Sequence, residues 1–523
     1  MSNSRRQRRE AERAARKSAP VPASPPAAPV PVAEDTPGPV PWAGLWLVLA
    51  FLAPNLSSVT GSFLYDDLPL IVQNKRLQFL SRLGEVWTHG YWPDRPGLTL
   101  YRPVTETVWN LVWVFGGGRP WPFHALNLAL GSAVVLLVYR LLVDLRVGYR
   151  VAFIASLLFA VLPIHSETVA AIVGGNEMLA AAFGLGALLL YRRGSELPAL
   201  VLFVLGVFSK ESAAAMAGVA LLFPFFESGR RFPLWRFAVH AAAACAVVAV
   251  YFWARAAVAE GPVFIPVIDN PMSLVGGPQQ IATALWVQVL YVAKSVAPVA
   301  LSADYSYKQI PLVMTLADPR AWAGLALAAV ALWSFARRPV TRFGIALWAL
   351  AFAPTANLLL PIGTTMGERL AYMPSIGLVL LLAQGLCRIP KAGLFAAAIL
   401  AAVFAGRTLE RNQVWHNADT FYPALAQTSP GSAKAQYFLG CWKAARGDDA
   451  GALASYNRAI EIFPAYPEAL NNRGNILVEL GRIPEAEASF RECLRFAPNH
   501  SGAAASFQSL EAGHIYVPQK PPI

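Results

Sequence analysis

The sequence is dominated by a series of long apolar segments separated by short patches that contain arginine. A helix needs about 20 apolar residues to cross the hydrocarbon core of a bilayer. Only 14% of the 523 residues are charged, whereas soluble domains carry about 25%. The charged residues concentrate at the two ends and between the apolar segments. The sequence therefore predicts an all-α, polytopic membrane bundle with polar regions at both ends.

Eleven apolar segments are candidates for membrane spans by their length and flanking charge. They are 42–62, 121–142, 151–164, 174–191, 197–209, 213–226, 236–254, 320–336, 343–361, 374–387 and 391–406. Several are shorter than a straight span requires, so their boundaries are approximate, and we expect about ten to twelve spans. We interpret the apolar segment 281–300 as re-entrant or as lying flat at the interface, and a real crossing there is the alternative.

Arginine positions predict the orientation of the bundle. If the spans alternate, one face collects the N-terminal tail, Arg146, Arg150, Arg192, Arg193, Arg230, Arg231, Arg337, Arg338 and Arg388. Basic residues favour the cytoplasmic side, so the loop 63–120 is predicted to lie on the opposite side. A crossing at 281–300 would place Arg337 and Arg338 on the wrong face. We expect a protein of the bacterial inner membrane, although an endoplasmic-reticulum protein would show similar charges.

Residues 1–41 are predicted to form a cytoplasmic tail rather than a signal peptide. The basic run from Arg5 to Lys17 is followed by a proline-rich stretch from Pro20 to Pro41 that has no apolar core. The basic run is either disordered or an amphipathic helix, and in both cases it should lie against anionic lipid. Much of the net charge of +12 comes from this run and from the span ends. Nucleic-acid binding is not expected, because no basic stripe with interleaved aromatic residues is present.

A repeated pattern marks the C-terminal region. Units 433–466 and 467–500 share a period of 34 residues, with Gly440 and Gly474, Gly447 and Gly481, Ala452 and Ala486, Tyr456 and Phe490, and Pro464 and Pro498 at matching positions. This is the pattern of the tetratricopeptide repeat (TPR), in which small residues allow close helix approach and aromatic residues fill the groove. A partial repeat is predicted before residue 433. The domains are thus 42–406 for the membrane bundle, 407–512 for the repeats and 513–523 for a tail.

The four cysteines show no metal-ligand spacing and are interpreted as packing residues. They are Cys245, Cys387, Cys441 and Cys493. A disulfide between Cys441 and Cys493 is the alternative for the two cysteines in the repeats.

Four polar clusters are predicted to share the non-cytoplasmic face: Tyr65-Asp66-Asp67, His165-Ser166-Glu167, Ser209-Lys210-Glu211 and Gly367-Glu368-Arg369. Charged residues at membrane depth cost about 2.5–3.5 kcal/mol each on insertion scales, so each needs a reason. Acidic and basic residues from different helices would meet on this face. That combination suits a substrate with a phosphate group and an acceptor hydroxyl that must lose its proton.

Taken singly, each cluster also has a simpler structural interpretation. These are a loop turn for the acidic pair, a helix cap for the His-Ser-Glu turn, a mutual ion pair of Lys210 with Glu211, and lipid-headgroup contact for Arg369. The functional alternatives are a general base or metal site at the acidic pair, and a metal or phosphate site at the His-Ser-Glu turn. Lys210 and Arg369 are candidates for phosphate contacts.

Several motifs occur in a fixed order along the chain: FLYDDLPLIVQN, YRPVTETVWNLVW, FHALNLALG, LPIHSETVAAIVGGNEMLAAAF, FSKESAAAM, GERLAYMPSIGLVLLLA and RNQVWHN, followed by the repeats. The series resembles the transmembrane-and-tetratricopeptide-repeat family of protein O-mannosyltransferases and their bacterial relatives, within the GT-C superfamily of membrane glycosyltransferases. The resemblance extends from Phe63 to Pro498. It implies a GT-C-like bundle that carries an acidic catalytic residue in its first non-cytoplasmic loop.

The resemblance also implies roles for particular residues. Asp66 or Asp67 would be the catalytic base, with donor-phosphate contacts from His165, Glu167, Lys210 and Arg369 and supporting roles for Glu211, Glu368, Tyr372 and Arg102. Asp67, His165 and Glu167 are a candidate set of ligands for a divalent metal, Mg or Mn, although a lipid-phosphate leaving group requires no cofactor. The family's ERYLY-like motif reads ERLAY here, with Leu370 and Ala371 in place of bulkier residues, which weakens inference about lipid or ring contacts.

The expected function is inverting transfer of a sugar from a polyprenyl-phosphate donor to a protein or glycan hydroxyl on the non-cytoplasmic face. The repeats would bind the acceptor or a partner protein, and the membrane lipid would surround the bundle. One alternative is a non-catalytic scaffold for envelope assembly. The other is a transporter of lipid-linked sugars, because ionisable residues in spans also mark transport paths.

Overall fold

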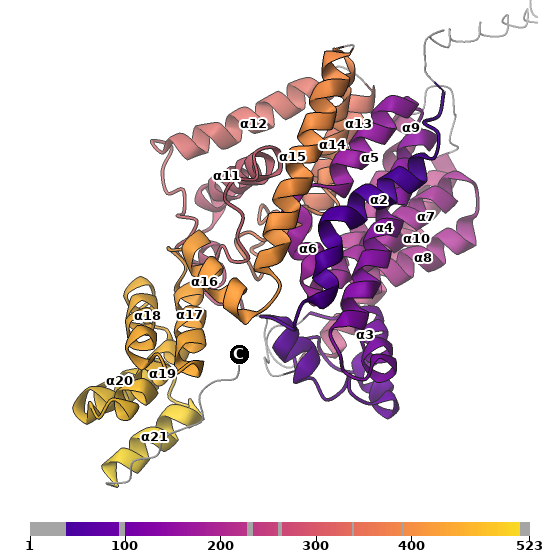
Figure 1. Cartoon of the computed structure of the whole chain (residues 1–523). Coiled ribbons are helices and arrows are strands. Elements are labelled where there is room, and N and C mark those ends of the chain that lie inside the picture. Colours follow the sequence, from indigo (N-terminus) through magenta and orange to yellow (C-terminus); the bar gives the residue numbers. More distant parts are fainter. Residues whose placement is uncertain are drawn as a thin grey trace, which may run out of the picture. The chain divides into compact units, whose positions relative to one another are not determined.

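The computed structural model describes residues 38–93, 100–226, 234–259, 264–336, 339–389 and 391–512. Within these ranges the regular elements are all helices, which confirms the predicted all-α class (Figure 1). The chain divides into two units, Met1–Pro39 and Val40–Ile523, and the second contains the helices discussed below. The predictions for residues 1–37, for 513–523 and for Arg230, Arg231, Arg337 and Arg338 fall outside the described residues.

Five helical segments among the described residues are long and apolar enough to cross a membrane. They are Ala43–Thr60, which begins with α2 (Ala43–Asn55); α4 (Trp121–Asp144); Ile172–Arg192, which contains α7 (Gly175–Arg192); Phe237–Ala257 of α10 (Leu234–Ala257); and α15 (Ala392–Val414). The pair Tyr149–Ala160 (α5) and Pro163–Ala170 is bent by 48° and gives a sixth if it forms one span. The chain is a multi-pass membrane protein, with fewer spans by this criterion than the ten to twelve predicted.

The smaller number has a physical reason, because several predicted spans form short helices. These are α8 (Glu196–Ser209), α9 (Ala215–Phe226), α13 (Pro339–Phe352) and α14 (Ser375–Cys387). A helix of 14 residues rises by about 21 Å, whereas the hydrocarbon core is about 30 Å thick. The segment 281–300 lies largely in α11 (Gly277–Val296), which is not among the five spanning segments. Its re-entrant or interfacial placement stays a prediction.

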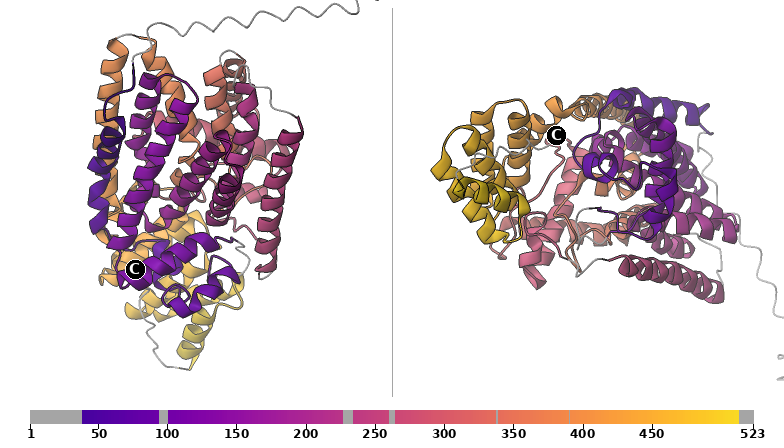
Figure 2. Two further views of the ribbon diagram at one scale, coloured as in Figure 1. Left: turned by 90° about the vertical axis from the view of Figure 1, so that its right-hand side faces the viewer. Right: turned by 90° about the horizontal axis from the view of Figure 1, so that it is seen from below.

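The main apolar core lies between α2, α4, α5, α14 and α15. One fully buried residue from each of four of these helices illustrates it: Leu47, Val138, Leu158 and Leu380. The left panel of Figure 2 shows α2 in indigo and α15 in orange side by side, although most of the chain separates them in sequence. Close packing of helices this distant in sequence fixes the loops between them, and those loops carry the predicted polar clusters.

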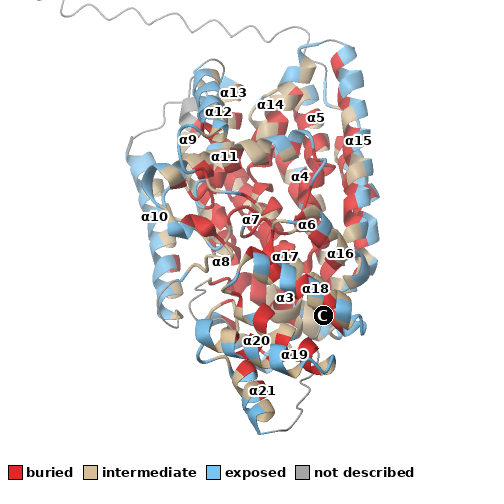
Figure 3. Cartoon of the chain, turned by 90° about the vertical axis from the view of Figure 1, so that its left-hand side faces the viewer, coloured by how far each residue is buried: buried red, intermediate tan, exposed pale blue. Residues whose placement is uncertain are grey.

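Helix α10 stands apart from this core. Figure 3 shows it with a mostly pale-blue, exposed surface at one edge of the helices. Its apolar side chains Val239, Phe252 and Trp253 are all exposed. Contiguous exposed apolar side chains mark a surface that contacts lipid or another protein. Because α10 meets the criterion for a span, lipid is the expected neighbour of this face.

The C-terminal helices form pairs at the positions of the predicted repeats. Helix α16 (Ala418–Thr428) follows α15 closely. The next helices are α17 (Ala433–Ala445), α18 (Asp449–Ile462), α19 (Pro467–Glu479), α20 (Ile483–Phe496) and α21 (Ser501–Glu511). Helix α17 packs on α18, α19 on α20, and α16 and α21 pack on the ends of the array. Figure 1 shows the pairs in yellow tones, connected through α16 to the last spanning helix.

The glycines of the repeats sit where a side chain would collide with the facing aromatic ring. A Cβ on Gly440 would lie 2.6 Å from Cε1 of Tyr456, and a Cβ on Gly474 would lie 2.5 Å from Cε1 of Phe490. Both rings are fully buried. This geometry bears out the predicted use of small residues for close helix approach.

Replacing Gly474 by alanine is therefore expected to destabilise the α19–α20 pair. Overpacking costs about 1–3 kcal/mol, more than the gain of about 0.5–1 kcal/mol that alanine brings to a helix. Amide hydrogen exchange in α19 and α20 should become at least about fivefold faster. Gly502→Ala is the matched control, since its Cβ would lie 3.5 Å from the His500 ring, an ordinary contact distance. Equal exchange rates in the two variants would show that the Phe490 ring moves aside at little cost in stability.

All four cysteines are free thiols, so Cys441 and Cys493 do not form the disulfide considered as an alternative. Both are buried, which fits their predicted packing role, and the hydroxyl of Tyr456 donates a hydrogen bond to Sγ of Cys441 at 3.5 Å. Cys245 differs from the prediction because it is exposed on α10.

Candidate active site

A cavity of about 500 Å³ opens where the polar clusters meet. This volume lies within the range of about 300–1,000 Å³ that is typical of ligand pockets. Six of the ten predicted site residues line it: Asp66, Arg102, Glu167, Lys210, Glu211 and Arg369. The other four, Asp67, His165, Glu368 and Tyr372, are not among its lining residues. The predicted convergence therefore holds for most, but not all, of the charged groups.

The two adjacent aspartates have different surroundings. Asp67 is buried, and its carboxylate accepts hydrogen bonds from the backbone N–H of Leu64 at 3.1 Å and of Val173 at 2.9 Å. Asp66 is 23% exposed and lines the cavity. The residue before it, Tyr65, has a φ of 53°, a left-handed conformation that turns the chain sharply at this point. The pair thus divides into one carboxylate that braces the backbone and one that faces the cavity.

The pKa of Asp67, taken alone, would favour this residue over Asp66 as a general base. Burial raises the pKa of Asp67 to about 7, against the opposing effect of its two backbone hydrogen bonds. A pKa near neutrality would suit a general base. A base must, however, reach the proton that it accepts, whereas both oxygens of Asp67 accept backbone hydrogen bonds and Asp67 does not line the cavity. Of the two aspartates, Asp66 is therefore the one whose carboxylate can meet a ligand in the cavity.

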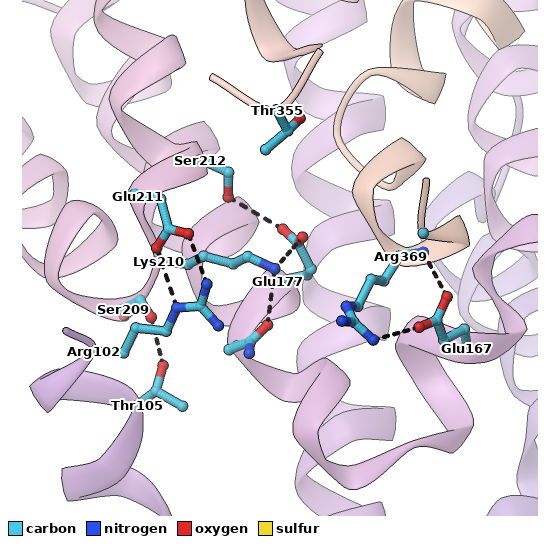
Figure 4. Close-up of polar contacts among 12 residues, drawn as sticks. Arg102, Thr105, Glu167, Glu177, Ser209, Lys210, Glu211, Ser212, Thr355 and Arg369 are labelled. Carbon is cyan, nitrogen blue, oxygen red and sulfur yellow. Dashed lines mark hydrogen bonds and ion pairs between the residues drawn. The ribbon is translucent and has the colours of Figure 1, made fainter. Parts of the chain in front are cut away.

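Arg369 lies beside Asp66 and is held there by Glu167. Its Nη1 is 2.6 Å from Oε1 of Glu167 and 3.8 Å from Oδ2 of Asp66. Its backbone N–H also donates to Oε2 of Glu167 at 2.9 Å. Glu167 belongs to the short helix α6 (Ser166–Ala170), and Arg369 to the 3-10 helix η8 (Glu368–Ala371). Figure 4 shows the pair of Arg369 and Glu167. A guanidinium has five N–H donors, so Arg369 keeps donors that can bind an anion.

A second ion-paired group lies across the cavity from Arg369 (Figure 4). Arg102, at the start of α3 (Pro103–Gly116), donates two hydrogen bonds to Glu211, at 3.1 Å and 2.7 Å. Lys210 is paired with Glu177 and also lies 3.4 Å from Oδ1 of Asn176. The mutual ion pair proposed for Lys210 and Glu211 is therefore wrong. The extended backbone at Lys210, where α8 ends, sends the two neighbouring side chains to different partners.

Glu177, the buried partner of the cavity residue Lys210, is a residue that the sequence interpretation missed. It lies in the first turn of α7, and its carboxylate also accepts from Oγ of Ser212 at 3.2 Å. Both members of the Lys210–Glu177 pair are about 3% exposed. A lone acidic residue at the start of an apolar span was the available signal, because such a charge needs a partner.

The His-Ser-Glu turn sends its two ionisable side chains in different directions. Glu167 faces the cavity, whereas His165 is buried between the rings of Phe159 and Tyr372, at centroid distances of 4.6 Å and 4.7 Å. Nε2 of His165 is 2.9 Å from Oγ of Ser375. His165 and Tyr372 are therefore buried packing residues, and neither of them lines the cavity.

The predicted metal-ligand set does not assemble. Asp67, His165 and Glu167 each bond to a different group, as described above. Among the described residues, no group of three or more His, Cys, Asp and Glu side chains is arranged to hold a metal ion. The donor set that was predicted for Mg or Mn therefore does not fit the geometry of these three residues.

Glu368 is a structural residue rather than a cavity residue. It is fully buried and accepts hydrogen bonds from the backbone N–H of Ser302 at 2.6 Å and from the hydroxyl of Tyr305 at 2.5 Å. Burial raises the pKa of Glu368 to about 7. These bonds fasten η8 to the segment 302–305 and so fix the position of the neighbouring Arg369.

The chain is similar to two protein families and to several known proteins. The family model described as "Protein O-mannosyl-transferase TMTC, DUF1736" matches residues 259–332, and the model described as "TPR repeat" matches residues 443–499. Human Protein O-mannosyl-transferase TMTC1 is 26% identical, with 80% of this chain and 55% of the relative covered. Human TMTC4 is 26% identical, with 79% and 66% covered. Mouse TMTC3 is 26% identical, with 87% and 56% covered. The chain thus spans between about half and two thirds of the length of these relatives.

Proposed function

Because the chain belongs to the TMTC-like O-mannosyltransferase family, we propose that it is a glycosyltransferase that moves a mannosyl group from a polyprenyl-phosphate donor to a protein hydroxyl. The observation that carries the proposal is the pairing of Asp66 with Arg369 at the edge of one cavity. The carboxylate can accept the proton of the acceptor hydroxyl, and the adjacent guanidinium can bind the phosphate of the donor.

Asp66 acts as the general base. It takes the proton from the acceptor hydroxyl while the hydroxyl oxygen bonds to C1 of the sugar, and the bond from C1 to the phosphate oxygen breaks. The polyprenyl phosphate leaves with the bonding electron pair. A single displacement of this kind inverts the configuration at C1. Asp67 holds the loop in place through its two backbone hydrogen bonds and does not itself exchange the proton.

Arg369 and Arg102 stabilise the departing phosphate. Each guanidinium lines the cavity and is oriented by a carboxylate, Glu167 for Arg369 and Glu211 for Arg102. Preoriented charged donors stabilise negative charge that develops in the transition state without reorganising at that moment. Lys210 was predicted to contact the phosphate, but its pairing with Glu177 and Asn176 favours a role in fixing the junction of α7 and α8.

The reaction is proposed to occur on the non-cytoplasmic side, which is the periplasm if the protein lies in a bacterial inner membrane. Asn176, at the start of α7, lines the cavity. At the other end of α7, Nη2 of Arg192 donates to the carbonyl oxygen of Asp144 at 2.9 Å, and Arg193 lies 3.9 Å from the Asp144 carboxylate. The cavity and the arginine-bearing helix ends are thus opposite one another, and arginine favours the cytoplasmic side.

The test is transfer by purified protein in proteoliposomes that contain mannosyl-phosphoryl-undecaprenol, with a threonine-containing peptide as acceptor. The expected product is a mannosylated peptide whose anomeric configuration, measured by NMR, is opposite to that of the donor. GDP-mannose in place of the lipid donor should give no product. Retention of configuration would overturn the single displacement, and transfer from GDP-mannose alone would overturn the choice of donor.

A further inference from the structure

One wall of the cavity comes from the C-terminal repeats. Lys434, in the first turn of α17, lines the cavity together with Asp269, Asp304 and Ser306. Nζ of Lys434 lies 2.7 Å from Oδ1 of Asp269, and the two side chains are 21% and 15% exposed. The first complete repeat helix therefore contributes a charged side chain to the same cavity as Asp66.

Hydrogen bonds join the start of the repeats to the segment 304–308 of the membrane domain. The backbone N–H of Lys308 donates to the carbonyl of Gly431 at 2.9 Å, and the N–H of Ala433 donates to the carbonyl of Tyr307 at 3.0 Å. The Asp304 carboxylate accepts from Oγ of Ser306 at 2.7 Å and also from Oγ of Ser432. The backbone hydrogen bonds at Gly431 and Ala433, directly before Lys434, fix this lysine relative to the cavity.

The repeats also hold the residue that precedes the proposed base. The ring of Tyr65 packs against Phe421 of α16 at a centroid distance of 5.8 Å and against Phe438 of α17 at 5.1 Å. Burial raises the pKa of the Tyr65 hydroxyl, and the nearby charges of Lys434, Asp304, Asp66 and Asp269 also act on it. Asp66 is therefore positioned between the membrane helices and the repeats.

The charge balance distinguishes this wall from the phosphate side. Asp269 and Asp304 provide two carboxylates beside the one ammonium group of Lys434, an excess of negative charge that disfavours a phosphate. The pair of Lys434 with Asp269 nevertheless has unused hydrogen-bonding capacity, since an ammonium has three N–H groups and a carboxylate accepts at two oxygens. A neutral ligand that carries both donors and acceptors suits this wall, and a polypeptide backbone is such a ligand.

We propose that Lys434 and Asp269 bind the main chain of the acceptor polypeptide and place its hydroxyl at Asp66. Lys434 donates to a backbone carbonyl, and Asp269 accepts from a backbone N–H. Recognition through the main chain selects an extended segment rather than a particular neighbouring side chain. This inference rests on the proposed transferase function, and it makes the first repeat helix a part of the active site.

The primary test is peptide binding, which does not depend on turnover. The probe is a fluorescent peptide with one threonine among alanines and glycines, titrated against the full chain in nanodiscs. Lys434→Met is expected to weaken peptide binding by about 10- to 100-fold, the loss typical of a hydrogen bond to a charged group. Lys443→Met is the matched control on the same helix, where the lysine bonds to Ser455 at 3.2 Å, and it should bind normally.

A charge swap separates acceptor binding from a purely structural ion pair. The double variant Lys434→Asp with Asp269→Lys keeps the pair but reverses the donor and acceptor positions. It should remain folded, bind peptide as weakly as Lys434→Met, and keep the KM for the lipid donor within about threefold of the wild-type value. Peptide binding restored by the swap, or unchanged in Lys434→Met, would overturn the proposal. Wild-type protein that binds peptide but never transfers sugar would overturn the proposed function and leave this binding result intact.

Discussion

Replacing Asp66 by asparagine is expected to lower kcat for sugar transfer by about 10²- to 10⁴-fold, the usual contribution of a general base. Asparagine has nearly the same shape but cannot take the acceptor proton. The carboxylate is 23% exposed and lies 3.8 Å from Nη1 of Arg369, so its loss should leave the surrounding fold intact. The measurement is steady-state transfer at saturating donor and peptide, with the amount of folded protein determined by size-exclusion chromatography.

Asp67→Asn is the matched control for this substitution. An amide can accept one of the two backbone hydrogen bonds that Asp67 now receives, but its NH₂ group would face the other donor. Leaving a buried donor unsatisfied costs about 1–3 kcal/mol of stability. The variant should unfold at a lower temperature while its folded fraction keeps kcat within about tenfold of the wild-type value. A larger loss of kcat in Asp67→Asn than in Asp66→Asn would reverse the two assignments.

Replacing Lys210 by methionine is expected to destabilise the protein by about 3–5 kcal/mol, because it leaves the Glu177 carboxylate buried without its cation. Both side chains are about 3% exposed. The hydrogen bond from Ser212 at 3.2 Å and the neighbouring Asn176 cannot replace a full positive charge. The expected observation is a large fall in the thermal unfolding temperature, measured by tryptophan fluorescence in detergent.

The double variant Lys210→Met with Glu177→Gln tests the cause of this loss. Removing both charges should recover most of the stability, since buried ion pairs contribute little beyond the penalty of separating them. The same variant also tests the earlier phosphate assignment of Lys210. A donor KM close to the wild-type value would support the structural role, and a folded variant with a strongly raised donor KM would restore Lys210 to the phosphate site.

The helical class and the repeats were predictable because each rests on local pattern. Apolar length identified the membrane helices, and the glycine and aromatic positions of the repeats identified their packing. The span boundaries were less predictable. The apolar segment predicted as the span 343–361 continues well past Phe352, whereas helix α13 ends at that residue. An apolar composition does not reveal where a backbone leaves the helical conformation.

For the site, the sequence predicted which charged residues share a location but not which of them form pairs. The shared location of Asp66, Glu167 and Arg369 followed from topology, since all three were placed on one face. Individual pairings did not follow, because nearly all of α7 and all of α8 lie between Glu177 and Lys210. Asp269 and Lys434 are 165 residues apart and belong to the membrane bundle and the repeats, and a single sequence has no pattern that pairs them.

An experimental structure with a non-transferable donor would decide whether this cavity is the active site. The ligand is a polyprenyl phosphonate analogue of the mannosyl donor, bound to the wild-type protein in a nanodisc and imaged by cryo-electron microscopy. The phosphonate is expected within hydrogen-bonding distance of Arg369, with C1 of the sugar facing Asp66 and the space beside Lys434 open for the peptide. A phosphonate held instead near the apolar cavity that Leu188, Phe203 and Ala243 line would mean that Asp66 is not the catalytic base.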